Sequence, residues 1–274
     1  FIIHILIARS NHENTIPMNS HLSHQTQVSH EWLSWAHPDP DGLQLRVLCR
    51  VIERLKRGEL NTEMDPIHTI MYKHKFTTKA KDWQSILKRT YFWVDWFSMP
   101  QPGAEKVEDI GETKMNVLRA EGSMAIQSIP AYVERSDFIL ILVPSLYHSD
   151  RKVPTCYRTW RRRGWCLLEL YAAAMARDSS NPPLLVRSER GTPMWMSPME
   201  VMKLSIGLAD FTCCQREERH GGECEFHESA CGGRRPFLRH YACVHPNKSS
   251  KRLPNIVMQS LNTLMPLEVT ECVM

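Results

Sequence analysis

The segment Phe138–Val143 (FILILV) is an unbroken apolar run in which apolar and polar residues do not alternate. A strand that is covered by helices on both faces has this pattern, because neither face meets water. Two further short runs, Tyr91–Phe97 (YFWVDWF) and Leu184–Val186 (LLV), are rich in aromatic or aliphatic residues and are bordered by prolines. We therefore predict buried strands at all three places.

Helical patterns precede each of these runs. An amphipathic helix is predicted before Gly58, because apolar residues recur there at the spacing i, i+3, i+4 and i+7: Leu48, Val51, Ile52 and Leu55. A second helix is predicted over Ser123–Glu134, where Pro130 must kink or restart it. A third is predicted over Trp165–Ala176, which contains no glycine or proline. Because strands that alternate with helices form βαβ crossovers, we predict an α/β fold, an open parallel sheet with helices on both faces.

The 274 residues suffice for one full α/β domain and an appendage, at roughly 150 residues per domain. Nearly all regular patterning falls within residues 28–204, which we predict to be the folded domain. Residues 1–27, rich in histidine and asparagine, form a predicted N-terminal extension. Residues 205–274 form a predicted irregular tail, rich in cysteine and histidine, which we expect to be disordered in part.

The composition excludes several classes of protein. With 42% hydrophobic and 23% charged residues, the chain is globular and not intrinsically disordered. Subtracting 30 acidic from 34 basic residues leaves a net charge of +4, too small for a dedicated nucleic-acid binder. No apolar run approaches the roughly 20 residues of a membrane span, so we expect no membrane partner. The nine cysteines, odd in number, fit reduced thiols and hence a cytoplasmic location.

The predicted tail also contains candidate zinc ligands. They are Cys213, Cys224, His227 and Cys231. Cys224 and His227 form the only tight pair, and no Cys-x-x-Cys follows that would complete a tetrahedral site. A structural zinc ion is therefore one interpretation, and unliganded thiols in an irregular tail are the other.

The most informative helical segment is Arg163–Leu170 (RGWCLLEL). Trp165 and Glu169 are four positions apart and therefore lie on one face of a helix. A carboxylate beside an indole can hold a sugar ring. In the alternative interpretation, Trp165 belongs to the core and Glu169 is a solvated helix charge. The helical pattern by itself leaves both interpretations open.

This segment also resembles a known family signature. The pattern Trp-Cys-Leu-x-Glu-Leu at residues 165–170, with Pro144, Ser145 and Tyr147 before it, resembles the signature of Toll/interleukin-receptor (TIR) domains. The plant and bacterial kinds are the most similar. Weaker matches follow the family order at residues 28–32, in the helix after 42, at 94–95 and within 125–136. The resemblance implies a flavodoxin-like sheet for residues 28–204.

The resemblance also implies an activity. Many TIR domains cleave the nicotinamide–ribose bond of NAD, and the glutamate of the motif, here Glu169, is their catalytic residue. Nicotinamide leaves as a neutral ring, so one carboxylate near the ribose suffices to stabilise the oxocarbenium-like transition state. NAD is then the substrate, and no cofactor is required. Since many TIR domains only assemble with one another, the alternative is a non-catalytic protein interaction module in signal transduction, and self-association is expected.

Nucleotide contacts follow from the same resemblance. His30, Glu31 and Trp32 occupy the loop in which TIR enzymes contact the nucleotide, although structural packing of the tryptophan is an equal alternative. Asp95 at the end of its strand either orients a ribose hydroxyl or caps the following loop. The stretch from residue 100 to 122 is longer than the compact loop of the family, so we expect a pocket of different shape.

Four arginines precede the predicted helix at residue 165. Because the N-terminus of a helix carries the positive end of its dipole, Arg161 and Arg162 are candidates for binding a pyrophosphate. Guanidinium groups and backbone N–H groups would hold the anion there. The alternative is a solvated basic turn or an interface with an acidic partner.

Overall fold

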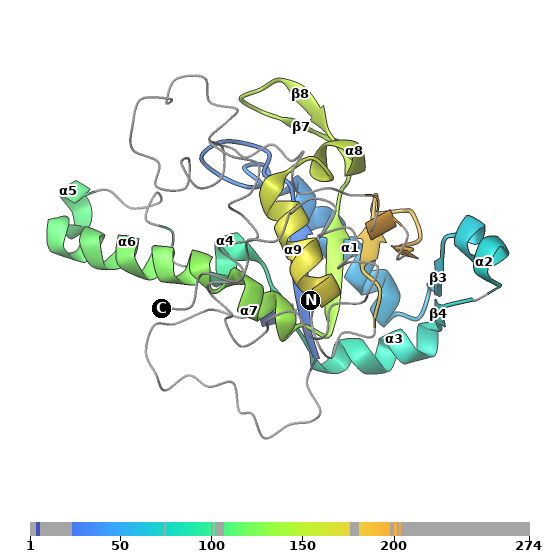
Figure 1. Cartoon of the computed structure of the whole chain (residues 1–274). Coiled ribbons are helices and arrows are strands. Elements are labelled where there is room, and N and C mark those ends of the chain that lie inside the picture. Colours follow the sequence, from blue (N-terminus) through green and yellow to red (C-terminus); the bar gives the residue numbers. More distant parts are fainter. Residues whose placement is uncertain are drawn as a thin grey trace, which may run out of the picture.

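The computed structural model describes residues 4–5, 24–73, 75–99, 101, 107–175, 181–197, 200–201 and 203. Its central feature is a sheet with the strand order β1-β5-β2-β6-β9-β10-β3-β4 (Figure 1). The strands of this sheet are β1 (His4–Ile5), β2 (His24–His30), β3 (Thr62–Met64), β4 (Thr77–Thr78), β5 (Thr90–Trp93), β6 (Phe138–Leu142), β9 (Leu184–Val186) and β10 (Met194–Trp195). A separate antiparallel hairpin consists of β7 (Leu146–His148) and β8 (Val153–Thr155).

Helices connect most of these strands. The described helices are α1 (Leu43–Lys56), α2 (Pro66–Tyr72), α3 (Ala80–Ile86), α4 (Asp95–Ser98), α5 (Val107–Ile110), α6 (Glu112–Gln127), α7 (Ile129–Glu134), α8 (Tyr157–Trp160) and α9 (Gly164–Met175). A short 3-10 turn, Leu87–Arg89, leads into β5. In Figure 1, α2 and α6 lie at opposite ends of the molecule.

The central strands β5, β2, β6 and β9 pair in parallel. β1 joins β5 in parallel, and β10 joins β3 in parallel. Only the β9–β10 and β3–β4 pairs of this sheet are antiparallel within the described residues. The chain is therefore a mixed α/β protein with a mostly parallel sheet, as the alternation of strands and helices predicts.

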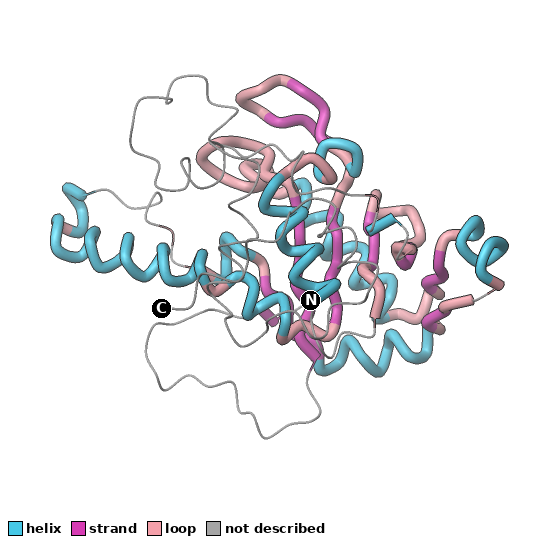
Figure 2. Tube along the Cα trace, in the orientation of Figure 1, coloured by secondary structure: helices cyan, strands magenta, loops and turns pink. Residues whose placement is uncertain are grey.

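Hydrophobic side chains cover both faces of the sheet. Leu140 and Leu142 of β6 belong to a cluster with residues of α1 and α3, whereas Ile139 and Ile141 belong to a cluster with residues of α7 and α9. Figure 2 shows helices on either side of the strands. All residues of β6 are buried, which explains why the run from Phe138 onward does not alternate.

The predicted helix before Gly58 is confirmed as α1. Its buried residues share one face and pack on the sheet: Val47, Leu48, Val51, Ile52 and Leu55. The preceding Gly42 has a φ of 65°, a left-handed conformation that glycine adopts without steric penalty. The predicted strand at 184–186 and the predicted helix from 165 are confirmed as β9 and α9.

Two predicted boundaries differ from the structure. The strand expected over Tyr91–Phe97 ends at Trp93, and Asp95–Ser98 instead forms α4, because the Ser98 hydroxyl accepts a hydrogen bond from the Val94 N–H. The helix expected from residue 123 begins at residue 112 as α6. The predicted restart at Pro130 is confirmed, since α7 begins there, and proline is well accommodated in a first helical turn.

The sheet also includes residues before position 28. β2 begins at His24, and β1 pairs with β5 although it lies within residues 1–27. None of the described helices is long and apolar enough to span a membrane. Apart from residue 203, the chain from 202 onward lies outside the described residues, and so does the predicted tail.

Candidate functional site

Three parallel strands end close together at one edge of the sheet. β2 ends at His30, β5 at Trp93 and β6 at Leu142, and the register pairs His30 with Leu142. Of the strands that pair with β2, β5 lies on one side of it and β6, which follows later in the chain, lies on the other. Ligands of open α/β sheets bind beyond the carboxyl ends of the strands where the strand order reverses in this way. This edge is therefore the candidate site.

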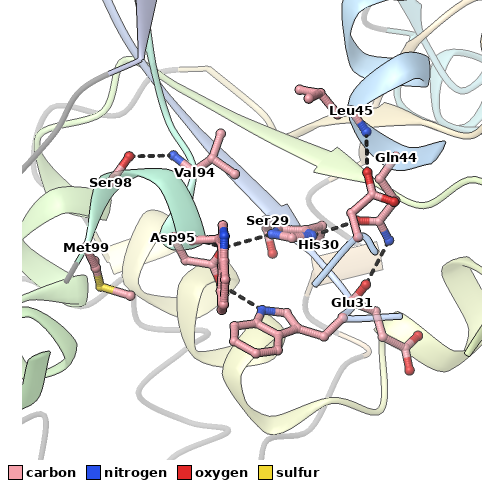
Figure 3. A network of polar contacts seen from close by, with 12 residues as sticks. Ser29, His30, Glu31, Gln44, Leu45, Val94, Asp95, Ser98 and Met99 are labelled. Carbon is pink, nitrogen blue, oxygen red and sulfur yellow. Dashed lines mark hydrogen bonds and ion pairs between the residues drawn. The ribbon is translucent and has the colours of Figure 1, made fainter. Parts of the chain in front are cut away.

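His30 lies between two hydrogen-bond acceptors at this edge (Figure 3). Its Nδ1 lies 2.7 Å from Oε1 of Gln44 in α1, and its Nε2 lies 2.9 Å from Oδ1 of Asp95. The amide of Gln44 is oriented, because its Nε2 donates to the backbone carbonyl of Glu31 at 2.8 Å. Both ring nitrogens of His30 therefore face acceptors, and the ring is an imidazolium.

Asp95 accepts hydrogen bonds from three donors. Its Oδ1 accepts from His30 and from the backbone N–H of Trp96 at 2.6 Å, and its Oδ2 accepts from the indole of Trp32 at 2.8 Å. Burial acts to raise the pKa of Asp95, but the charge of His30 and these hydrogen bonds outweigh it and lower that pKa. Asp95 is therefore a carboxylate at neutral pH.

The partners of His30 determine its charge. Burial acts to lower the pKa of His30, since an imidazolium is poorly solvated inside a protein. The charge of Asp95 and the hydrogen bonds that His30 donates to Asp95 and Gln44 outweigh burial, and the pKa rises to about 9. The pKa and the hydrogen-bond geometry thus agree on a charged His30.

Glu169 reaches this edge from α9 and is 9% exposed. Its Oε1 accepts from Nε2 of Gln27 at 3.1 Å, and the hydroxyl of Ser29 also bonds to it. The Ser29 oxygen accepts from the indole of Trp160 at 3.2 Å, which leaves its hydroxyl proton for Glu169. Burial raises the pKa of Glu169 to about 7, against the lowering effect of these bonds and of the charge of His30.

This arrangement sets what the site can do chemically. A buried carboxyl with a pKa near neutrality is present both as the acid and as the carboxylate at physiological pH. It can therefore move a proton, or it can stabilise a cation that develops beside it. Cys166 on the same helix does not offer a second reactive group, because burial and the charge of Glu169 raise the pKa of its thiol well above the ordinary value.

Glu31 faces α8 and not this network. Its Oε2 accepts from the hydroxyl of Thr159 at 2.6 Å, and the residue is 4% exposed. Burial raises the pKa of Glu31 despite that hydrogen bond and the nearby charge of Arg163. Glu31 therefore ties the loop after β2 to α8, and a nucleotide contact by its carboxyl stays a prediction.

Aromatic side chains surround the carboxylate of Asp95. The rings of Trp32 and Trp96 meet edge to face with centroids 5.7 Å apart, and the ring of His37 lies 4.5 Å from that of Trp96. All three residues are half-buried. Flat apolar rings of this kind provide surface on which another flat ring can stack.

The arginines and Trp165 lie on the α8–α9 side of the molecule. Arg161 and Arg162 are exposed, and their backbone N–H groups donate to the carbonyls of Tyr157 and Thr159. These two N–H groups are therefore engaged within the protein, and anion binding at the start of α9 stays a prediction. Trp165 is half-buried and packs on the cluster beneath α7 and α9.

Comparisons with known proteins do not assign the chain to a family. No family model, curated protein or solved structure matches the chain. The resemblance of residues 165–170 to TIR domains therefore remains a prediction from the motif.

The structure brings together four of the predicted site residues. His30, Trp32 and Asp95 share one network, and Glu169 lies close enough for the charges of His30 and Asp95 to shift its pKa. Arg161 and Arg162 are exposed at the turn between α8 and α9. The zinc candidates Cys213, Cys224, His227 and Cys231 lie outside the described residues. Elsewhere, the described part of the chain contains no group of three His, Cys, Asp or Glu residues placed to hold a metal.

Sequence patterns missed the residues that position this site. They are Gln27, Ser29, Gln44 and Trp160. A signal was present in β2, because Gln27 and Ser29 are polar residues in a fully buried part of a central strand. Buried polar groups in a strand require partners from packed elements, and those partners cannot be identified from the strand itself.

Proposed function

We propose that this chain is an NAD glycohydrolase of TIR-like, flavodoxin-like architecture, with Glu169 as its catalytic residue. The observation that supports the proposal most strongly is the Glu169 carboxyl, held by Gln27 and Ser29 at the carboxyl edge of the parallel sheet. Four neighbouring strands have the order β5-β2-β6-β9. Of these four, β2 comes first in the chain and second in the sheet, which agrees with the proposed architecture.

The proposed chemistry requires one well-placed negative charge. The bond between ribose C1′ and the nicotinamide nitrogen breaks, and its electron pair neutralises the pyridinium ring. Positive charge moves onto the ribose, where the carboxylate of Glu169 stabilises it. A water molecule then forms the new bond to C1′ and releases one proton to Glu169 or to solvent. The products are nicotinamide and ADP-ribose.

Access to Glu169 adds a condition to this proposal. At 9% exposure, the carboxyl is covered by the protein around it. A ribose reaches it only if substrate binding or self-association displaces part of that cover. If self-association displaces the cover, turnover should depend on protein concentration, because association then stabilises the open form by mass action.

The test incubates the purified full chain with NAD and measures free nicotinamide, at low and at high protein concentration and with a crowding agent. Glu169→Gln should reduce turnover by about 100-fold or more, the loss expected on removing a main electrostatic stabiliser. Glu112→Gln, a change of an exposed residue in α6, is the matched control and should leave turnover unchanged. Equal turnover in wild type and Glu169→Gln would remove the proposal.

A second candidate is a non-catalytic interaction module. Three apolar residues of α2, Ile67, Ile70 and Met71, are 67%, 77% and 67% exposed and share one helix face. Exposed apolar stripes of this kind are typical of protein contact surfaces. Under this alternative the chain self-associates and produces no nicotinamide in any of the conditions above.

A further inference from the structure

Two buried polar atoms on the neighbouring strands β2 and β5 have no hydrogen-bond partner in the described part of the chain. They are Oε1 of Gln27 and Nε1 of Trp93. The two residues are 0% and 1% exposed. An unpaired donor or acceptor in the interior is costly, because in the unfolded chain water satisfies it.

The two atoms belong to neighbours on adjacent strands. The parallel register of β2 and β5 pairs Gln27 with Trp93, so their side chains point to the same face of the sheet. This is the face of α7 and α9, because the Trp93 ring stacks on Tyr132 of α7 at 5.2 Å and Gln27 bonds to Glu169 of α9. One atom is an acceptor and the other a donor, yet they do not bond to each other.

We propose that the protein binds one internal water molecule between Oε1 of Gln27 and Nε1 of Trp93. Water accepts the indole proton with one lone pair and donates one of its own protons to the glutamine oxygen. A cation is excluded, because the indole N–H points its positive end at the site. An anion is excluded, because the carboxylate of Glu169 lies on the other side of the same glutamine amide. A buried water needs two to four polar partners, and these two atoms supply the minimum.

With this water as its partner, the side-chain amide of Gln27 can adopt either of two orientations, which a direct bond to Trp93 would not allow. When Glu169 is a carboxylate, the NH2 group of Gln27 donates to it and the oxygen faces the water. When Glu169 gains a proton, the amide can turn by half a rotation to accept that proton. Water serves either amide orientation, because it donates and accepts. The water site thus lets one buried pair accommodate both protonation states of Glu169, whichever function the chain performs.

The test is nuclear Overhauser transfer from water to tryptophan indole protons, measured in solution on the full chain with 15N-labelled tryptophan. The Trp93 resonance is assigned by its loss in Trp93→Phe. Transfer to this proton is expected in wild type, and its absence would overturn the proposal. In Ser29→Ala, which removes a buried hydroxyl of the same strand that could relay magnetisation, the transfer should persist, and its loss there would also overturn the proposal.

A second variant tests the bridge itself. Gln27→Met removes the acceptor and keeps an unbranched side chain of similar size, so transfer to the Trp93 proton should fall to the noise level. Retained transfer would show that Gln27 does not hold the water. Should this variant not fold, the wild type and Ser29→Ala decide the question. A crystal structure supports the proposal with one ordered water bonded to both atoms, and contradicts it with a direct Gln27–Trp93 bond.

Discussion

The Nε2 atom of His30 lies 2.9 Å from Oδ1 of Asp95, although 65 positions separate the two residues in the chain. His30 ends β2 and Asp95 begins α4 just after β5, so the parallel pairing of these strands brings them together. Gln44 and Trp32 complete their hydrogen bonds from the other sides. This charged pair lies close enough to Glu169 to influence its pKa.

The first prediction concerns stability above neutral pH. The pKa of His30 is raised from 6.5 to about 9, so its stabilising effect is fully present below pH 6.5 and is lost as the pH rises to 9. The free energy of unfolding, measured with urea, should fall by about 2 to 3 kcal/mol between pH 7 and 9. His30→Gln should lack most of this fall, and Glu169→Gln should retain it. An equal fall in His30→Gln and wild type would contradict the assignment of charge to His30.

The second prediction is that Glu169 destabilises the fold at alkaline pH. Its pKa is raised from 4.5 to about 7, so folding stability declines as the pH rises through this interval. Glu169→Gln should therefore be more stable than wild type at pH 8, by about 1 to 3 kcal/mol, and should differ less at pH 5. Such a gain on removing a functional residue is typical of active sites.

The control for this second prediction is Glu112→Gln in the exposed first turn of α6, which should change stability little at either pH. Urea titrations of the three proteins at both pH values provide the measurement. A variant at position 169 that loses stability at pH 8 would show that the carboxylate is favoured in its surroundings.

The third prediction separates substrate binding from chemistry. If Arg161 and Arg162 hold the pyrophosphate of NAD, the double change to Ala should raise KM about 10-fold and leave kcat nearly unchanged, because such contacts are made equally before and in the transition state. Arg190→Ala, at another exposed arginine, is the matched control. Unchanged KM in the double variant would assign the arginines to a solvated turn.

The fourth prediction concerns the exposed face of α2. If this face mediates self-association, Ile70→Asp should weaken association about 10-fold or more, because a charge would be buried in an apolar contact. Sedimentation velocity over a concentration series measures the effect. Val117→Asp changes another exposed apolar residue, which lies in α6 at the other end of the molecule, and should leave association intact. Equal effects of the two variants would exclude α2 as the specific surface.

Local sequence patterns determined the secondary elements that pack by simple hydrophobic periodicity. No tertiary information was needed to predict three elements: β6 from its continuous apolar run, α1 from its i, i+3, i+4 spacing, and α9 from its unbroken helical pattern. The spacing of apolar residues in the sequence shows whether one face or two faces of an element are buried. The end of β5 was not predictable in this way. Trp96 and Phe97 continue its aromatic pattern, and a hydrogen bond between Val94 and Ser98 turns the chain into α4 instead.

Only the tertiary structure decided the charges of the candidate site. Glu169 is 142 positions from Gln27, and its pKa depends on burial by α9 and on partners from β2. A helix pattern alone is equally consistent with a solvated glutamate and with a buried one. Strand register and helix packing determine which polar groups meet in the interior, and electrostatic energies there depend on those distances and on the exclusion of water.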